Sequence, residues 1–581
     1  MSNQSTAAQA TDAPKESVKE TLISIVIAFA LAFVFRGFVV EAFVIPTGSM
    51  APTLMGAHMR FQSDATGYSW PVGPWHLRQG TSEAKAIQGQ RGVDGPITVH
   101  DPMSGKRFDG VDIASRAGDR ILVLKYLYGF REPERYDVVV FKNPGEPAVN
   151  YIKRLIGLPG EQIALVDGDV FVHKSDGRTT GFGPGGVEWD APGWQIARKS
   201  DAVSKTVWQP VFDAEFTPPN ANAGGVTWFQ TPWVGQSAGW AVEGQRAYTY
   251  DGAGPTALAW DSNRDFIRDA KMGLKWEISD RYAYNECYDR LPRNFPVGDI
   301  RLRAGIEIPD LPVGRMGIRP SVAEGAVPSV SAIVTARGHE FRGMVTAGKA
   351  SVAMRPQPTT DQPDPAWKEL GQGETHGIRS GFVAQIEFWH IDQRLELLVD
   401  GKVAARGEYD WTPAERIAAA TGQSLADLLS RKDQLGRVLP AGAQLSDPSI
   451  YKASGARWEF SGGPVVVHRA ALDRDLHYRP DFRRSLQPGE SQPGPAWATH
   501  PNTVMTLGPD HFFVLGDNSP ASEDGRLWTG PDSWVASEID PTIGVVPREL
   551  MLGKAFFVYF PALAGNSPIP MPDFGRLRFI W

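Results

Sequence analysis

The chain has 581 residues, too many for one ordinary domain, which predicts two to four folded units. With 42% hydrophobic and 22% charged residues it is typical of a globular protein, and its 61 Gly and 46 Pro favour β-structure and loops over helical bundles. Lys and Arg number 59 against 66 Asp and Glu; this net charge of −7 argues against a nucleic-acid partner. The single cysteine, Cys287, excludes an intrachain disulfide and a cysteine-based zinc ribbon.

The N-terminal region divides into a polar leader and an apolar run. Residues 1–20 show no apolar period and are expected to be disordered. Residues 22–40 read LISIVIAFALAFVFRGFVV, with Arg36 as the one charge, and such a run reaches across the roughly 30 Å hydrocarbon core of a bilayer. We therefore expect a retained transmembrane helix at 21–41 rather than a cleaved signal peptide, because no clean small-x-small site follows. Lys15 and Lys19 favour a cytoplasmic N-terminus.

Short apolar runs bounded by Gly and Pro follow the predicted helix. They are typical of antiparallel strands, and they predict a mainly β protein with a barrel-like core. Residues 57–116, between the apolar segment and the first of these runs, are rich in Gly and Pro and are expected to be irregular. The strand-like runs stand at 119–130, 135–144, 150–173, 511–530 and 553–561.

A second β-rich region lies between these runs. Its strand patterns and the Asp400-Gly401 hairpin signal predict a separate β-sandwich, with a resemblance to concanavalin-like jelly rolls in the hairpin pattern. Residues 414–436 show helical spacing, and 488–497 are linker-like. The strand patterns stand at 297–308, 381–411 and 456–472.

A serine after the apolar run lies in a setting that suits a nucleophile. Gly48 permits an unusual backbone angle directly before Ser49, so the Ser49 N–H can point at an oxyanion, and Thr47 offers a second donor. The eleven His residues show no triad-like context. A lysine can serve as the base if burial disfavours its charged form. Lys153, beside Ile152 on a predicted strand, is the candidate, and a solvent-facing lysine is the alternative.

Three motifs in order resemble one known family. Ile-Pro-Thr-Gly-Ser-Met-Ala-Pro-Thr-Leu is followed by Arg-Tyr-Asp-Val-Val-Val-Phe with Tyr-Ile-Lys-Arg, and then by Gly-Asp-Asn-Ser-Pro-Ala-Ser-Glu-Asp-Gly-Arg. This wording resembles bacterial signal peptidase I, also called leader peptidase, a Ser/Lys serine endopeptidase of family S26. The C-terminal GKAFFVYFP and GRLRFIW extend the similarity. The resemblance implies a catalytic core at 42–56, 117–173 and 500–581, interrupted by insertions at 57–116 and 174–499.

The resemblance also implies a role for each matching residue. Ser49 would be the acylated nucleophile and Lys153 its neutral base, with Thr47 joining the Ser49 amide in the oxyanion hole. Ser522 would orient the lysine, and Asp524 and Arg526 would form a supporting ion pair. The loop beneath the site would be shaped by Gly516, Asp517 and Asn518. The small pockets for Ala-like side chains would be lined by Ile45, Pro46, Met50, Leu54, Tyr151 and Ile152.

Some features depart from the family or suggest other chemistry. Ser519-Pro520 stands where many relatives have Arg and an acidic or amide residue, and both insertions are unusually long. Ser82 and Lys85 fit the Ser-x-x-Lys pattern of penicillin-binding proteins, but the other motifs of that class are missing around them. His390, Asp392 and Glu396 could ligate a metal, although solvent-facing residues of a strand are the favoured interpretation. The sequence indicates no metal or cofactor.

These observations predict a single-pass enzyme of the cytoplasmic membrane with its catalytic domain on the extracytoplasmic side. It would remove signal peptides from exported preproteins after Ala-x-Ala motifs, with preproteins and the lipid bilayer as partners. One alternative is a membrane-anchored protein with a degenerate peptidase core, whose insertion binds a glycan or a protein. Another is a processing peptidase dedicated to a narrow substrate set. Intact Ser49, Lys153 and Ser522 argue against the degenerate core.

Overall fold

The structure is a computed structural model that describes most of the chain. It is mainly β, as the sequence predicts, and its named strand pairs are antiparallel. The described residues are 18–34, 40–73, 98–109, 116–174, 181–182, 188–223, 226–244, 246–268, 274–286, 293–309, 328–346, 348–440, 442–483, 494–564 and 571–580.

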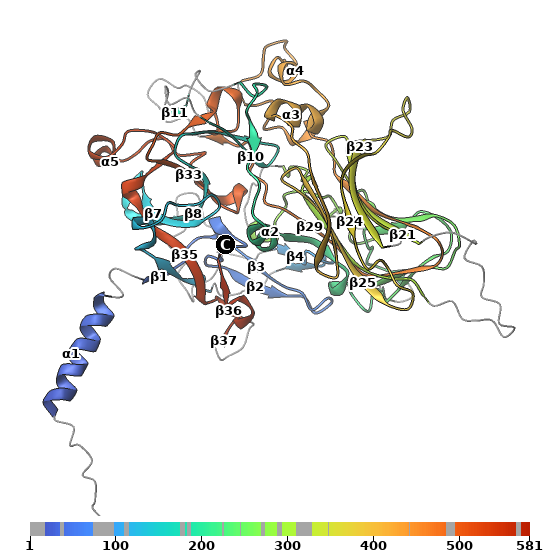
Figure 1. Ribbon diagram of the computed structural model, residues 1–581, viewed down its shortest axis with the longest axis horizontal. Helices are drawn as coiled ribbons and strands as arrows, with labels where there is room; N and C mark the ends of the chain where they lie inside the picture. The colour runs from blue at the N-terminus through green and yellow to red at the C-terminus, as the bar shows by residue number, and fades with distance from the viewer. Residues whose placement is uncertain are drawn as a thin grey trace, which may run out of the picture.

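The predicted membrane segment corresponds in part to helix α1 (Val18–Val34), which projects away from the rest of the molecule (Figure 1). Several apolar side chains between residues 22 and 29 are exposed, among them Leu22 and Phe29. No helix in the described part of the chain is long and apolar enough to cross a membrane. Residues 1–17 and 35–39 lie outside the described residues, so the disordered leader and the helix at 21–41 stay predictions.

The first large sheet contains the peptidase-like motifs. It brings together strands from both ends of the chain, because β35, near the C-terminus, lies between β6 and β7. Runs of β-branched residues such as Val138–Val140 favour these strands. In sheet order the strands are β1 (Val40–Val44), β6 (Arg120–Leu124), β35 (Met551–Phe560), β7 (Val138–Asn143), β8 (Glu146–Gly157), β33 (His511–Leu515) and β34 (Val546–Pro547), with β38 (Arg578–Phe579) beside β35.

A smaller second sheet continues from the first. The turn Leu158–Gly160 leads from β8 into its strand β9, and Asp167-Gly168 makes a tight hairpin to β10 with both residues at positive φ. Its strands in order are β11 (Gly181–Phe182), β32 (Met505–Thr506), β9 (Glu161–Val166), β10 (Asp169–Lys174) and β12 (Gln195–Ile196).

The insertion forms two packed sheets that enclose one apolar core, on the right of Figure 1. The first sheet contains β17 (Trp240–Glu243), β18 (Ala247–Tyr250), β29 (Val465–Arg474), β20 (Ile300–Glu307), β25 (Val383–Ile391), β26 (Arg394–Val399) and β27 (Lys402–Glu408), with β13 (Gln209–Asp213) beside β29. The second contains β16 (Trp233–Gly235), β19 (Thr256–Trp260), β28 (Gly455–Ser461), β21 (Ser329–Ala336), β22 (His339–Thr346), β23 (Lys349–Pro356) and β24 (Lys368–Glu374). A sandwich therefore exists, and its likeness to concanavalin-type jelly rolls stays a prediction.

Short elements complete the fold. Residues 57–116, expected to be irregular, contain the hairpins β2 (Met59–Gln62) with β3 (Ser69–Val72) and β4 (Thr98–His100) with β5 (Arg107–Asp109). Other hairpins pair β14 (Asn222–Ala223) with β15 (Val226–Thr227), β30 (Phe482–Arg483) with β31 (Gly494–Pro495), and β36 (Leu563–Ala564) with β37 (Met571–Pro572). The 3₁₀ helices are η2 (Gly48–Met50), η4 (Leu127–Gly129), η5 (Ala214–Phe216), η6 (Ala283–Asn285), η7 (Pro448–Ile450), η8 (Pro501–Thr503), η9 (Ser519–Ala521), η10 (Arg548–Leu550) and η11 (Phe574–Arg576).

Local signals explain two elements that the sequence predicts. Asp400 and Gly401 form a two-residue turn between β26 and β27, with φ of 48° and 76°, as a type I′ hairpin requires. Helix α3 (Pro413–Thr421) starts at a capping box, in which Thr412 and Glu415 each accept a hydrogen bond from the other's backbone N–H. The predicted helical region at 414–436 is thus confirmed in part, with α4 (Leu425–Leu429) following; α2 (Asp201–Val207) and α5 (Ser533–Glu538) are the remaining short helices.

Candidate active site

Ser49 and Lys153 meet in the first sheet although 104 positions separate them. Ser49 lies on η2, directly after β1, and Lys153 lies on β8 opposite Val139 of β7. The Lys153 Nζ and Ser49 Oγ atoms are 2.6 Å apart and hydrogen-bonded, and each side chain is buried, with 4% of its residue surface exposed. The solvent-facing alternative for Lys153 is therefore wrong. A hydroxyl and an amine at this distance can exchange a proton.

Thr47 stands beside the serine. Its Oγ1 lies 3.3 Å from Ser49 Oγ, and it occupies the N-cap position of η2 without capping the helix through its side chain. The first N–H groups of a helix have no acceptor within the helix, so the Ser49 N–H belongs to a donor-rich turn. The hydroxyl of Thr47 and the Ser49 N–H thus lie on the same short segment.

The loop after β33 packs directly under the serine. The Asn518 N–H donates to the Ser49 carbonyl at 3.0 Å, and Asn518 Nδ2 donates to the Gly48 carbonyl at 3.1 Å. A Cβ added at Gly516 would overlap both Ser522 Oγ and the Ser49 carbonyl oxygen. Only glycine fits at that close approach, so this loop fixes the backbone that carries Ser49.

Ser522 lies across Gly516 from the Ser49 backbone and is buried. Its Oγ has no hydrogen-bond partner among the described residues. The expected hydrogen bond from Ser522 to Lys153 is therefore not formed in this structure, where Lys153 Nζ is bonded to Ser49 instead. A buried hydroxyl without a partner is costly, and a change of rotamer is the small movement that would satisfy it.

Asp517 is held by an arginine that the sequence did not single out. Arg154 follows Lys153 on β8, and its Nε and Nη2 donate to the two Asp517 carboxylate oxygens at 2.7 Å each, with both side chains fully buried. Thr53 Oγ1 donates to the same carboxylate. Burial acts to lower the pKa of Arg154, but the charge of Asp517 outweighs it and raises that pKa. This bidentate pair fastens β8 to the loop after β33.

Asp524 and Arg526 form a second buried ion pair. Arg526 Nε and Nη2 donate to the two Asp524 oxygens at 2.9 and 3.0 Å, and the Gly516 N–H donates to Asp524 at 2.9 Å. Arg526 also donates to Ser519 Oγ at 2.7 Å. Ser519, one of the departures from the family wording, therefore serves as an internal partner of the loop.

The predicted pocket residues divide between two apolar clusters. Ile45, Met50 and Leu54 are buried in one cluster, against which Ile152 packs. Tyr151 packs in another, as the alternation of a strand requires, although its ring lies 5.3 Å from Lys153 Nζ. The remaining candidate, Pro46, is exposed.

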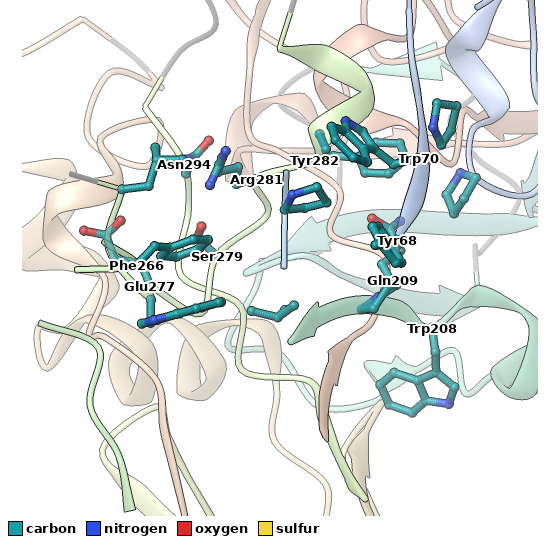
Figure 2. Close-up of a pocket in the computed structure, with 18 of the residues that line it drawn as sticks. Tyr68, Trp70, Trp208, Gln209, Phe266, Glu277, Ser279, Arg281, Tyr282 and Asn294 are labelled. Carbon is teal, nitrogen blue, oxygen red and sulfur yellow. The ribbon is translucent and has the colours of Figure 1, made fainter. Parts of the chain in front are cut away.

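A cavity lies beside the site and not at it. It has a volume of about 440 Å³, and the catalytic loop contributes Pro52 and Met55 to its lining, whereas Ser49 and Lys153 do not line it. Six of its lining residues are aromatic, among them Trp70 and Tyr282, which Figure 2 shows close together. The cavity therefore borders the catalytic loop without including the catalytic pair.

Four buried carboxylates lie close enough to suggest a metal site. The ligand atoms of Asp169, Asp299, Asp392 and Asp475 are all within 4.8 Å of one another. Lys199 contacts two of these carboxylates, with Nζ 2.5 Å from Asp392 and 2.8 Å from Asp475. The cluster is completed by Arg337, Arg416 and Asp167. Protein cations thus already occupy the positions that a metal would take.

The candidate ligands His390, Asp392 and Glu396 do not face solvent. All three are buried, and they do not converge on one point. His390 bonds to the Gly298 carbonyl and the Tyr409 hydroxyl, Asp392 pairs with Lys199, and Glu396 pairs with Arg394. The solvent-facing interpretation is wrong, because His390 is stacked against Phe341 inside the sandwich and the two carboxylates are enclosed in ion pairs. Cys287 and the Ser82–Lys85 pattern lie outside the described residues.

Two residues of the large insertion also touch the catalytic loop, and sequence reasoning missed them. Tyr284 and Asn285, on η6, are fully buried against it. Asn285 exchanges hydrogen bonds with Asn518. No local pattern marks either residue, since their partners lie far away in sequence.

Comparison with known families agrees with the motifs. The family described as "Signal peptidase, peptidase S26" matches residues 18–84, 111–181 and 461–560. The signal peptidase I of Rickettsia typhi is 29% identical over 158 residues, which is 27% of this chain and 44% of that protein. The signal peptidase I of Pseudomonas aeruginosa is 39% identical over 83 residues, 11% of this chain and 29% of that protein. The chain thus spans less than half the length of these relatives.

These matches confirm the resemblance to signal peptidase I and mark the unmatched stretches as large insertions. Among solved structures, the carbohydrate-binding module CBM66 from Bacillus subtilis is 7% identical, with a TM-score of 0.21, over 42% of this chain and 96% of that one. Sheep galectin-11 is 10% identical, with a TM-score of 0.17, over 32% and 95%. Likenesses at these scores carry no argument about the insertion.

Proposed function

We propose that this protein is a membrane-anchored serine endopeptidase that removes signal peptides from exported preproteins. Ser49 is the nucleophile and Lys153 is the general base. The observation that carries this proposal is the 2.6 Å hydrogen bond between Lys153 Nζ and Ser49 Oγ, made between two buried side chains on the segments that match signal peptidases.

The reaction follows from this pair. Neutral Lys153 accepts the Ser49 proton as Oγ bonds to the scissile carbonyl carbon, and the negative charge moves to the carbonyl oxygen. The Ser49 N–H and the Thr47 hydroxyl are the donors for that oxygen. The C–N bond then breaks while the lysine ammonium returns its proton to the leaving amine. Water, deprotonated by Lys153, hydrolyses the acyl-enzyme and regenerates Ser49.

Burial supports the role of Lys153 as a base. An amine in an apolar setting resists carrying charge, because its ammonium form loses hydration. The Lys153 Nζ atom is hydrogen-bonded to Ser49 Oγ at 2.6 Å, and this is the oxygen whose proton the base must accept.

Substrate selection is proposed to rest on small apolar pockets beside Ser49. Ile45, Met50, Leu54 and Ile152 gather in one cluster, which suits Ala-like side chains before the cleaved bond. A preprotein would add as an extended strand, so main-chain bonds supply affinity and the pockets supply selectivity. Cleavage after Ala-x-Ala is the expected preference.

The membrane anchor is part of the same proposal. The exposed apolar side chains of α1 support insertion in a bilayer, with the catalytic domain outside the cytoplasm. The full chain should resist carbonate extraction from membranes, and a chain lacking residues 1–39 should be released. Extraction of both forms alike would reject the anchor and leave the peptidase proposal intact.

The decisive experiment is cleavage of an exported precursor with an Ala-x-Ala site by detergent-solubilised protein. Ser49→Ala and Lys153→Ala should each abolish the cut product. Ser537→Ala and Lys142→Ala, the same substitutions at exposed positions, are the matched controls and should cut like wild type.

Two results would reject the proposal. If Ser49→Ala cuts as well as wild type, Ser49 is not the nucleophile. If wild type does not cut, the alternative of an anchored binding protein with a degenerate core takes precedence. Cleavage of one precursor but not of several unrelated ones would instead favour a dedicated processing peptidase.

A further inference from the structure

A short segment of the large insertion reaches the loop that carries Ser49. Residues 280–286 contain η6, whose Tyr284 and Asn285 are buried with 0% and 1% of their surface exposed. Tyr284 packs with Ala51 and Met55 of the catalytic loop in one apolar cluster. The insertion therefore forms part of the wall behind the nucleophile.

Asn285 and Asn518 form a reciprocal amide pair. Asn285 Nδ2 donates to Asn518 Oδ1 at 2.7 Å, and Asn518 Nδ2 donates to Asn285 Oδ1 at 2.9 Å. The same Asn518 Nδ2 donates to the Gly48 carbonyl at 3.1 Å. Both hydrogens of that nitrogen are thus used, one on the insertion and one on the catalytic loop.

This pairing sets the orientation of the Asn518 amide. An asparagine side chain can rotate to exchange its oxygen and nitrogen, and only its partners decide between the two. With Asn285 present, Nδ2 faces the Gly48 carbonyl. The opposite orientation would place Asn518 Oδ1 against the Gly48 carbonyl oxygen. The hydrogen bond that holds Gly48, the residue before Ser49, would then be lost. Asn285 thereby acts on Ser49 through Asn518.

Tyr284 restrains the same turn by contact. A Cβ added at Gly48 would overlap the Tyr284 ring, so the ring lies directly against the backbone before Ser49. The Tyr284 hydroxyl donates to the Ala57 carbonyl at 3.0 Å, beyond the far end of the loop. The ring and the hydroxyl together span the loop from Gly48 to Ala57.

Two residues of the 57–116 region and one distant residue of the large insertion hold the segment in place. The Gly73 N–H donates to the Tyr284 carbonyl at 2.8 Å, and the His100 N–H donates to Glu286 at 2.8 Å. Asp280 pairs with buried Arg479. On its other side the segment contributes Arg281 and Tyr282 to the cavity of Figure 2. The segment is thus wedged between the cavity and the catalytic loop.

We infer that Tyr284 and Asn285 are positioning residues for Ser49, so that the large insertion completes the peptidase site. This inference rests on the proposed function. Removal of the large insertion at 174–499 would also remove the partners of Gly48 and Asn518, so the insertion is more than an accessory of the core. The contacts of both residues are with the backbone and the loop around Ser49, so the inferred effect is on the alignment of the nucleophile.

The test is steady-state cleavage of the Ala-x-Ala precursor by full-length variants. Asn285→Ala should lower kcat about 10- to 100-fold, as small misplacements of reacting groups do, with KM changed by no more than about twofold. Asn294→Ala is the matched control: Asn294 lines the cavity from the same insertion, and its substitution should leave kcat unchanged.

A double-mutant cycle tests the route through Asn518. If the two amides act as one unit, Asn285→Ala should add nothing to the loss caused by Asn518→Ala. Losses that multiply would overturn the coupling. A purely structural role would lower the melting temperature and leave the kcat of the folded fraction unchanged, which would overturn the inference.

The outcomes separate this inference from the proposed function. If wild type cuts and Asn285→Ala has the wild-type kcat, the inference fails and the proposed function stands. If wild type does not cut, the proposed function fails first. If Asn285→Ala does not fold, Tyr284→Phe is the second variant, because it removes one hydroxyl and keeps the ring. Tyr284→Phe should lower kcat severalfold. A wild-type kcat for this variant would overturn the inference.

Discussion

Two of the junctions between the large insertion and the peptidase-like core differ in their chemistry. Near Ser49 the contact consists of neutral groups, the Asn285–Asn518 amide pair and the Tyr284 ring. At the hairpin between β9 and β10 the contact is ionic: Asp167 and Asp169 of the core meet Arg337 and Arg416 of the insertion. The neutral junction lies next to the proposed base, and the ionic one involves the second sheet.

The difference has an electrostatic meaning. A net charge beside a lysine that must become neutral would change its proton affinity, whereas amides and a ring position the backbone without adding charge. The ionic junction can use strong charge-assisted bonds because no proton transfer is proposed there. It gathers five carboxylates against three cations, and two of its members, Asp169 and Asp475, have raised pKa values.

Breaking the ionic junction should have the largest effect on stability. Arg416→Met removes a cation between Asp167 and Asp169 and leaves buried carboxylates without compensation. We expect a loss of about 3–5 kcal/mol in the free energy of unfolding, measured by urea denaturation. The kcat of the folded fraction should stay near wild type. A selective loss of kcat would show that the two junctions are not separable.

The ionic junction should also give a pH dependence. Burial raises the pKa of Asp475 to about 7, helped by Asp392 and Asp299 and opposed by Lys199. The folded protein then holds a proton that the unfolded chain releases near pH 4, so the contribution of Asp475 to stability falls as pH rises from about 4 to about 7. Relative to wild type, Asp475→Asn should gain on the order of 2 kcal/mol between pH 5 and pH 8. If the free energies of unfolding of wild type and Asp475→Asn changed in parallel with pH, this prediction would be contradicted.

Overfilling the neutral junction should cost less stability and more activity. Gly48→Ala places a methyl group into the Tyr284 ring. We expect about 1–3 kcal/mol of destabilisation and a marked fall in kcat. Combining Gly48→Ala with Tyr284→Val should recover part of the stability. A Gly48→Ala enzyme with wild-type stability and kcat would mean that the ring does not press on this turn.

An exposed ion pair outside both junctions should give the smallest change in stability, and it is the reference with which the junction variants are compared. Arg437 and Asp433 form an ion pair in which the Arg437 side chain is 73% exposed. Arg437→Ala should change the free energy of unfolding by no more than about 0.5 kcal/mol. A change as large as that of Arg416→Met would remove the distinction between buried and exposed pairs.

Local signals made part of this fold predictable from sequence. β-branched runs marked strands such as β7, Asp400-Gly401 marked a type I′ turn, and the family wording placed Ser49 and Lys153 on segments that do meet. These predictions succeeded because each depends on neighbours in the chain or on a whole motif.

The junctions could not be predicted, for physical reasons. Charged residues are exposed by default, so Arg416 and Asp392 gave no sign of burial. Asn285 depends on a partner 233 positions away. Ser522 lies across Gly516 from the Ser49 backbone, and the conformation of its hydroxyl is a matter of side-chain rotation that sequence does not encode.

The central position of β35 has a consequence for synthesis. This strand lies between β6 and β7, so the first sheet stays open until residues 551–560 have left the ribosome. The sandwich has all its strands by residue 474 and can fold first. A nascent chain would therefore expose a finished insertion while Ser49 and Lys153 still lie beside two separate halves of the first sheet. Ribosome-stalled chains ending at residue 545 should be inactive, and cleavage by such chains would contradict this order of assembly.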